Sequence, residues 1–127
     1  MSATPDELKY SADHVWIRME DDFIGVCGLT DHAQEQLTDI VFVELPEIDT
    51  DVRQGERLAV VESVKATTNV NAPVSGRIVE VNTALEDSPG VINADPYGDG
   101  WIFKIDVKGR VEYDDLMDAD QYRAQVE

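Results

Sequence analysis

The sequence predicts a mostly β domain: a small barrel with one short internal helix and a second helix at its C-terminal end. Runs rich in β-branched and aromatic residues recur at short intervals, and turn-forming residues separate them. Only two segments have a helical pattern instead. At 127 residues the chain can bury one core of its own, and no linker-like tract divides it. We therefore expect residues 1–127 to form a single domain.

The chain opens with two predicted strands and the internal helix. The strands are expected at Val15–Arg18 and Phe23–Cys27, with an acidic turn between them. Thr30–Leu37 fits a short helix, with Asp31 as its N-cap and Gln34 three residues later.

Four more strands and the C-terminal helix follow. The strands are predicted at Ile40–Leu45, Leu58–Val64, Arg77–Val81 and Trp101–Val107, and turn-forming residues fill 47–51, 73–76 and 95–100. The helix is predicted at Asp114–Gln125, with Leu116, Met117 and Tyr122 as its buried side chains. Three aspartates near its start suit the positive end of the helix dipole.

The composition excludes several functions. A net charge of −17 leaves little to neutralise phosphates, which excludes nucleic-acid binding and argues against an anionic membrane surface. No apolar window could span a bilayer, and Met1–Glu7 lacks the features of a secretory or import leader, so we expect a cytoplasmic protein. The single Cys27 permits no intrachain disulfide and is expected to be buried. The acidity itself has two explanations that the sequence leaves open: charge repulsion that maintains solubility, or adaptation to high salt.

Lys65 is the most informative residue of the chain. It is the only lysine between Lys9 and Lys104, and it lies between two strand-like stretches, Leu58–Val64 and Thr67–Val70. The simplest geometry is a tight hairpin with Lys65 at its tip, although no Gly, Asn or Pro marks the turn. A lysine presented alone is suited to covalent modification. An ordinary exposed turn lysine is the alternative, and spacing alone does not decide between them.

Several segments resemble one family in the same order along the chain. Glu62–Ala66 followed by Ala72–Gly76 is similar to the lipoyl-acceptor segment of the glycine cleavage system H proteins. The resemblance extends over nearly the whole chain, through Tyr10, His14 and Trp16, the segments 28–34 and Ile40–Pro46, and the segments 91–93 and 95–101.

The resemblance implies a small flattened lipoyl/biotinyl-type barrel-sandwich hybrid, in which Lys65 carries lipoic acid through an amide bond. Glu62, three residues before the lysine, and Gly76, eleven residues after it, occupy positions that the modifying enzyme (a lipoate ligase or an octanoyl transferase) would read. Each also has a simpler explanation: Glu62 as a solvated strand residue, and Gly76 as part of the turn after Pro73.

The sequence shows no catalytic constellation and no cluster of metal ligands. His14 and His32 are far apart in the sequence, and neither is obviously paired with a serine or cysteine. The resemblance therefore implies a monomeric, non-catalytic carrier whose reactive atoms belong to the cofactor. Its implied partners are a pyridoxal-phosphate-dependent glycine decarboxylase that supplies an aminomethyl group, a tetrahydrofolate-dependent aminomethyltransferase that receives it, and dihydrolipoyl dehydrogenase.

Two positions depart from the family pattern. The family usually places a glutamate directly after the histidine of the opening segment and an aspartate four residues past the lysine, and both carboxylates contact the loaded arm. Here these positions are Val15 and Asn69. If the stretch is extended, Asp13 lies on the same strand face as Val15 and could substitute for a missing carboxylate.

Three other functions remain as alternatives. Val15 and Asn69 favour an H-like protein that relays lipoyl groups or carries another sulfur-bound intermediate, without glycine cleavage activity. A biotin carrier would share the fold, but Val64 and Ala66 flank the lysine where biotin acceptors usually have methionines. A structural protein with an unmodified Lys65 is the last alternative.

Overall fold

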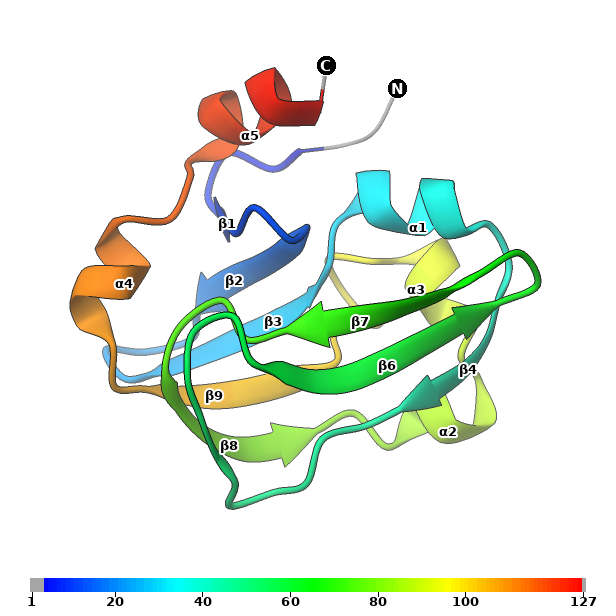
Figure 1. The fold of residues 1–127 in the computed structure, drawn as a ribbon, viewed down its shortest axis with the longest axis horizontal. Helices are drawn as coiled ribbons and strands as arrows, with labels where there is room; N and C mark the ends of the chain where they lie inside the picture. The colour runs from blue at the N-terminus through cyan, green and yellow to red at the C-terminus, as the bar shows by residue number, and fades with distance from the viewer. Residues whose placement is uncertain (1–3, 127) are drawn as a thin grey trace.

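Two antiparallel sheets form the body of the protein, and they do not close into a barrel (Figure 1). The computed structural model describes residues 4–126. The expectation about Met1–Glu7 falls partly on residues 1–3, which lie outside the described residues. One sheet has the strand order β1-β2-β3-β9-β8-β5 and the other β4-β6-β7. This arrangement confirms the predicted mostly β class and the flattened barrel-sandwich hybrid that the resemblance implies, in which the two sheets do not close.

The element bounds are as follows. The larger sheet contains β1 Lys9–Tyr10, β2 Val15–Met19, β3 Ile24–Leu29, β5 Asp51–Val52, β8 Gly76–Val81 and β9 Phe103–Val107. The smaller contains β4 Ile40–Glu44, β6 Arg57–Ser63 and β7 Thr67–Asn71. The helices are α1 Asp31–Leu37, α2 Ala84–Asp87, α3 Val91–Ala94, α4 Arg110–Asp114 and α5 Ala119–Val126.

The main core lies between the two sheets. Inward-facing side chains of both sheets fill it, and fully buried residues such as Val61 and Val70 of the small sheet share one cluster with Ile78 and Ile105 of the large sheet. Burial of each such side chain contributes about 1.5–3 kcal/mol. The other face of β2 presents Trp16, which belongs to a second cluster beneath α5.

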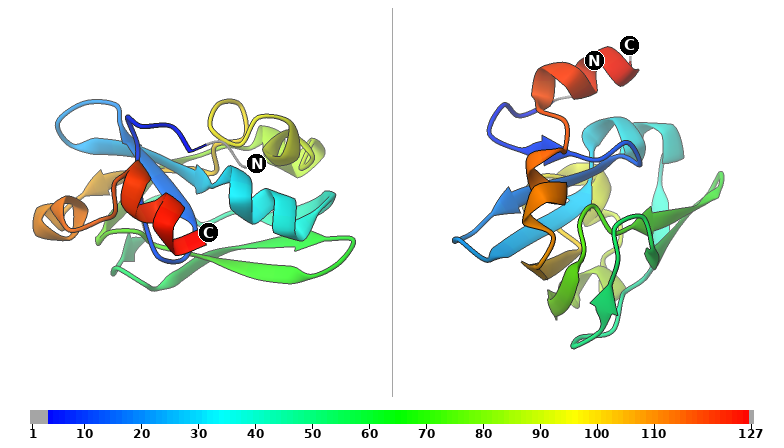
Figure 2. Two further views of the ribbon diagram at one scale, coloured as in Figure 1. Left: turned by 90° about the horizontal axis from the view of Figure 1, so that it is seen from above. Right: turned by 60° about the vertical axis from the view of Figure 1, so that its left-hand side comes forward.

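The second cluster attaches the C-terminal helix to the sheet. The rings of Tyr10 and Tyr122 stack with centroids 4.7 Å apart, and Nε1 of Trp16 donates a hydrogen bond to the carbonyl of Pro96 at 3.0 Å. Figure 2 shows α5 lying across one end of the molecule, over β1. The buried indole and phenol groups thus have polar partners, as buried Trp and Tyr usually do.

The six predicted strands are confirmed within two residues at each end, whereas the helices differ from expectation. More than one internal helix is present, because α2, α3 and α4 join α1. The N-cap of α1 is Thr30, not Asp31, because Oγ1 of Thr30 accepts a hydrogen bond from the N–H of Ala33 at 3.2 Å. The two-residue strands β1 and β5 were not predicted.

The predicted helix at Asp114–Gln125 is wrong in its first part: α4 ends at Asp114, residues 115–118 are not helical, and only α5 from Ala119 matches the prediction. Met117 is not helical and forms an antiparallel bridge with Tyr10: the N–H of Tyr10 donates to the carbonyl of Met117 at 2.8 Å, and the N–H of Met117 donates to the carbonyl of Tyr10 at 2.9 Å. Asp118 then caps the N–H of Gln121 at 2.9 Å. Cys27 is buried as expected, and burial raises the pKa of its thiol. No helix within residues 4–126 is long and apolar enough to cross a membrane.

Candidate functional site

Lys65 lies at the tip of a β-hairpin. Strands β6 and β7 pair in antiparallel register as far as Glu62 opposite Thr67, and the turn follows at once. Figure 1 shows this hairpin extending beyond the rest of the small sheet and passing beside α1. Val64, Lys65 and Ala66 are all exposed. The structure therefore confirms the predicted hairpin and its exposed lysine.

Ser63 builds the turn that presents the lysine. Its Oγ accepts hydrogen bonds from the N–H of Lys65 at 3.1 Å and from the N–H of Ala66 at 2.9 Å. Its own N–H donates to the carbonyl of Ala66 at 2.8 Å. A serine that satisfies the backbone two and three residues later replaces the Gly or Asn usual in hairpin turns. This role of Ser63 was not predicted from the sequence, although a serine two residues before the tip was the available signal.

A groove begins beside the lysine. Nζ of Lys65 donates a hydrogen bond at 3.4 Å to the carbonyl of Gln36, near the C-terminal end of α1. Gln36 is also part of the wall of a cavity of about 170 Å³ between α1 and β7. Leu29, Ala33 and Leu37 give the cavity apolar surface, and the remaining lining residues are polar: Asp13, His14, His32, Gln36, Thr68 and Asn69.

Two histidines form part of the groove wall. The rings of His14 and His32 lie 5.3 Å apart between centroids, and Nδ1 of His14 is hydrogen-bonded to the hydroxyl of Tyr122 at 2.7 Å. The same hydroxyl contacts Oγ1 of the buried Thr30 at 2.7 Å. Burial lowers the pKa of His14, the nearby His32 lowers it further, and Asp13 opposes both effects. The imidazole of His14 is therefore predominantly neutral at pH 7 and can accept a hydrogen bond.

The groove includes two of the three residues expected to contact a loaded arm. Asp13 and Asn69 both line it, whereas Val15 is fully buried in the main core, opposite Leu29. The expectation that Asp13 shares a strand face with Val15 is wrong. Strand β2 begins only at Val15, and His14 between them has a left-handed backbone (φ 67°), so the alternation of a strand does not apply. Asp13 reaches the groove from the loop instead.

The two predicted recognition residues lie in different surroundings. Glu62 is half-buried on the outer face of β6, opposite Phe42 and Thr67. Gly76 is buried at the start of β8, where a Cβ would lie 2.2 Å from the backbone oxygen of Asp106. The close approach of strand β9, not the turn after Pro73, therefore explains the glycine. Its role in recognition by a modifying enzyme stays a prediction.

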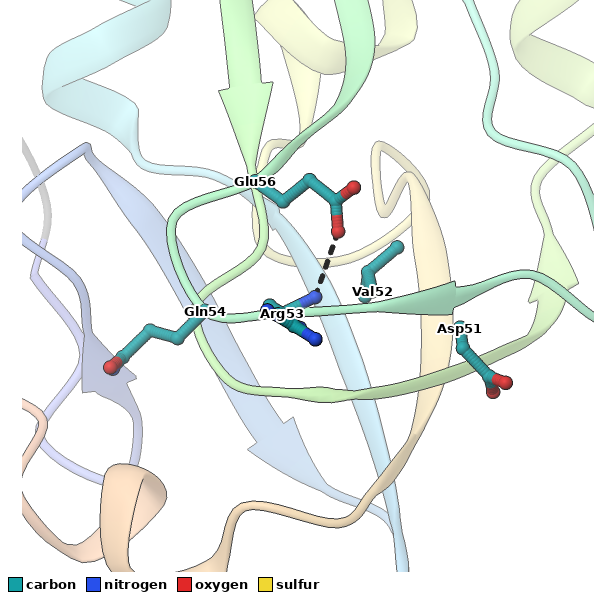
Figure 3. A pocket seen from close by; sticks show the side chains of 5 residues that line it. All are labelled: Asp51, Val52, Arg53, Gln54 and Glu56. Carbon is teal, nitrogen blue, oxygen red and sulfur yellow. Dashed lines mark hydrogen bonds between the residues drawn. The ribbon is translucent and has the colours of Figure 1, made fainter.

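Another hollow lies far from the lysine. The loop after β5 encloses about 520 Å³, lined by Asp51, Val52, Arg53, Gln54 and Glu56 (Figure 3). Within it, the N–H of Arg53 donates to the Glu56 carboxylate at 2.9 Å. The seven residues of β6, roughly 20 Å of strand, separate this loop from the hairpin tip. The hollow is therefore separate from the lysine site. Among residues 4–126, no three His, Cys, Asp or Glu side chains are grouped as metal ligands.

The fold and the hairpin define a class of protein: a flattened two-sheet domain that presents one exposed lysine at a hairpin tip. The chain belongs to the glycine cleavage H-protein family, whose model matches residues 8–127. Members of this family are lipoyl-bearing carrier components of the glycine cleavage system.

Individual relatives agree with this assignment over their full length. The chain is 50% identical to the glycine cleavage system H protein of Coxiella burnetii (strain Dugway 5J108-111), and 53% identical to that of Cronobacter sakazakii. Each comparison covers 100% of this chain and 98% of the relative. The crystal structure of a glycine cleavage system H protein from Mycobacterium marinum superposes with a TM-score of 0.89 at 40% identity, covering 96% of this chain and 98% of that one.

Proposed function

We propose that Lys65 is the lipoyl attachment residue and that the chain shuttles the aminomethyl group of glycine. The group would pass from a pyridoxal-phosphate-dependent decarboxylase to a tetrahydrofolate-dependent aminomethyltransferase, and dihydrolipoyl dehydrogenase would reoxidise the carrier. The observation that carries the proposal is the solitary lysine at the exposed hairpin tip of a family member. The chain itself contributes no catalytic group to this proposal. A monomeric state and a cytoplasmic location stay predictions.

The site suits the proposed cofactor. When bound, the lipoyl group supplies a disulfide that accepts the aminomethyl group at one sulfur and is reduced as it does so. Amide formation at Nζ changes the formal charge of the chain by one unit, from −17 to −18. No ammonium then has to be desolvated when the lysine stem enters a partner's active site. The apolar wall of the groove, from Leu29, Ala33 and Leu37, suits an aliphatic arm.

Asp13 would hold the amine of a loaded arm in the groove. It is the only carboxylate among the lining residues, and Val15 and Asn69 replace the two carboxylates typical of the family. Its carboxylate accepts a hydrogen bond from the side-chain amide of Asn71 at 3.3 Å, and a charged donor would displace that amide. A charge-assisted hydrogen bond contributes about 1.5–3 kcal/mol, against about 1 kcal/mol for a neutral one.

This role of Asp13 has a direct test. Asp13→Ala should accelerate the release of formaldehyde and ammonia from the loaded protein, and Asp114→Asn on the distant helix α4 is the control for loss of one negative charge. Release at the wild-type rate from Asp13→Ala would exclude Asp13 as the holding group.

The test of the overall proposal is the intact mass of the protein. Lipoylated protein would be weighed before and after incubation with glycine, pyridoxal phosphate and the cognate decarboxylase. Gain of one lipoyl group on Lys65, then of one aminomethyl unit, is the expected result. The neutral residues Val15 and Asn69 favour a second candidate, a lipoyl relay or a carrier of another intermediate. Lipoylation without aminomethyl loading would support that candidate, and no lipoylation would refute both.

A further inference from the structure

Three large apolar side chains are exposed next to the lysine turn. Val41, Phe42 and Val64 have exposed fractions of 53%, 50% and 69%. The register of β4 against β6 shifts between Ile40 and Phe42, and at this irregularity two consecutive apolar residues, Val41 and Phe42, both reach the surface. The N–H of Val64 donates to the carbonyl of Asp39 at 3.0 Å, which joins the turn to the start of β4. The exposed apolar surface is therefore continuous with the lysine.

A hollow of about 440 Å³ adjoins this surface. Phe42, Leu45 and Val81 are among the apolar residues of its wall, and Glu44 and Glu86 are the only charged residues that line it. Strand pairing places Glu62 directly opposite Phe42 on the same outer face. The surface thus combines exposed apolar groups with carboxylates and, apart from Lys65 itself, contains no cation among these lining and paired residues.

Such a surface is complementary to an arginine or lysine of a partner. The aliphatic stem of that side chain would cover Leu45 and Val81, while its charged end would lie between the carboxylates of Glu44 and Glu86. Arginine suits the position better, because its planar guanidinium pairs with two carboxylates and is weakly hydrated. Apolar contacts with Val41, Phe42 and Val64 would exclude water around the pair.

The geometry of the reaction selects one partner. Amide formation requires neutral Nζ of Lys65 to attack an activated lipoyl carboxyl, with loss of the leaving group and a proton. Reacting atoms must approach within about 3–3.5 Å, so the enzyme that attaches the arm has to contact the protein surface beside the turn. Enzymes that act on the far end of the finished arm do not have to approach so closely.

We propose that the face formed by Val41, Phe42 and Val64, with the hollow between Glu44 and Glu86, docks the lipoyl-attaching enzyme. An arginine of that enzyme, flanked by apolar residues, occupies the hollow. Glu62 lies within the same contact, which gives a physical reason for the recognition role predicted for it. The inference rests on the proposed function of Lys65 as lipoyl acceptor.

Steady-state kinetics of lipoylation test this docking face. A lipoate ligase supplied with ATP and lipoate would act on the unmodified full chain, and the variants are Phe42→Ser and the double change Glu44→Gln/Glu86→Gln. Each should raise KM for the protein roughly tenfold, which corresponds to about 1.4 kcal/mol of lost contact, with a smaller effect on kcat. The double variant should also flatten the salt dependence of kcat/KM.

Matched controls lie elsewhere on the surface. Phe23→Ser removes an aromatic residue of similar exposure from the turn between β2 and β3, and Asp114→Asn/Asp115→Asn removes the same charge from α4 and the residue after it. Both controls should keep KM within about twofold of wild type.

The outcomes separate the two proposals. If the ligase modifies wild-type protein but the face variants and the controls have the same KM, the docking proposal is overturned and the lipoyl role stands. If wild-type protein is never modified at Lys65, both fail.

Discussion

Removal of one hydroxyl should impair the presentation of Lys65. In Ser63→Ala, the N–H groups of Lys65 and Ala66 lose the Oγ acceptor that lies 3.1 and 2.9 Å away. The backbone pair between Ser63 and Ala66 remains, because the N–H of residue 63 still donates to the carbonyl of Ala66 at 2.8 Å. The hairpin should therefore persist while its tip samples open conformations more often.

The magnitude follows from the two hydrogen bonds that the N–H groups of Lys65 and Ala66 lose. The hydroxyl also donates to the carbonyl of Ala66 at 3.1 Å, but that carbonyl keeps the N–H of residue 63 as a donor, so this third bond adds little. A hydrogen bond contributes about 0.5–1.5 kcal/mol net, and in this exposed turn the lower end applies because water can replace each bond. Two bonds at about 0.5 kcal/mol each give about 1 kcal/mol, or roughly a fivefold shift from ordered toward open turn. If the modifying enzyme requires the ordered turn, kcat/KM for lipoylation falls by up to about fivefold.

Two measurements test this prediction: lipoylation rates for the fall in kcat/KM, and amide hydrogen exchange for the opening of the turn. Initial rates would be followed by intact mass for wild type, Ser63→Ala and Ser63→Thr, since threonine retains the hydroxyl and should behave as wild type. Hydrogen exchange at the amides of Lys65 and Ala66 would report the opening of the turn. If these amides exchange faster in Ser63→Ala while lipoylation proceeds at the wild-type rate, an ordered turn is not needed for modification and the reasoning is refuted.

Three further changes test the packing around the site. In Gly76→Ala, the new Cβ would lie 2.2 Å from the Asp106 oxygen, so urea unfolding should show a loss of about 1–3 kcal/mol. Rejection of the folded variant by the ligase would support the predicted recognition role of Gly76, whereas lipoylation at the wild-type rate would show that the glycine serves packing alone. Tyr122→Phe removes the hydroxyl that is hydrogen-bonded to both Thr30 and His14. The free energy of unfolding should fall by about 0.5–1.5 kcal/mol for each lost bond, and an unchanged unfolding midpoint would contradict that value. The pKa of His14 is lowered from 6.5 on folding, so the unfolded chain binds more protons below pH 6.5 and stability falls on acidification. His14→Gln should make that decline shallower as the pH falls below about 7, and parallel curves for the two proteins would show that His14 is not its source.

The longer strands were predictable because local pattern and tertiary burial agree in them. Val15–Met19 and Arg57–Ser63 are short, mostly apolar runs rich in β-branched residues, and the side chains that face the core within them, such as Ile17 and Val61, are fully buried. The four-residue helices α2 and α3 are too short to show a helical period, and the strands β1 and β5 are too short to show alternation. The break between α4 and α5 depends on the pairing of Met117 with Tyr10, more than 100 residues earlier, which no local pattern encodes.

Sequence alone was sufficient for the strand pattern and the hairpin, because these depend on neighbouring residues. The isolation of Lys65 in an acidic chain drew attention to it, and its role as attachment residue stays a prediction. Only the tertiary structure showed the groove beside the lysine, with Asp13 inside it and Val15 outside it. It alone also showed the close packing that requires Gly76. Each of these joins side chains from separate elements. Contacts between distant segments depend on how the sheets and helices pack in three dimensions, and no single segment of the sequence determines that packing.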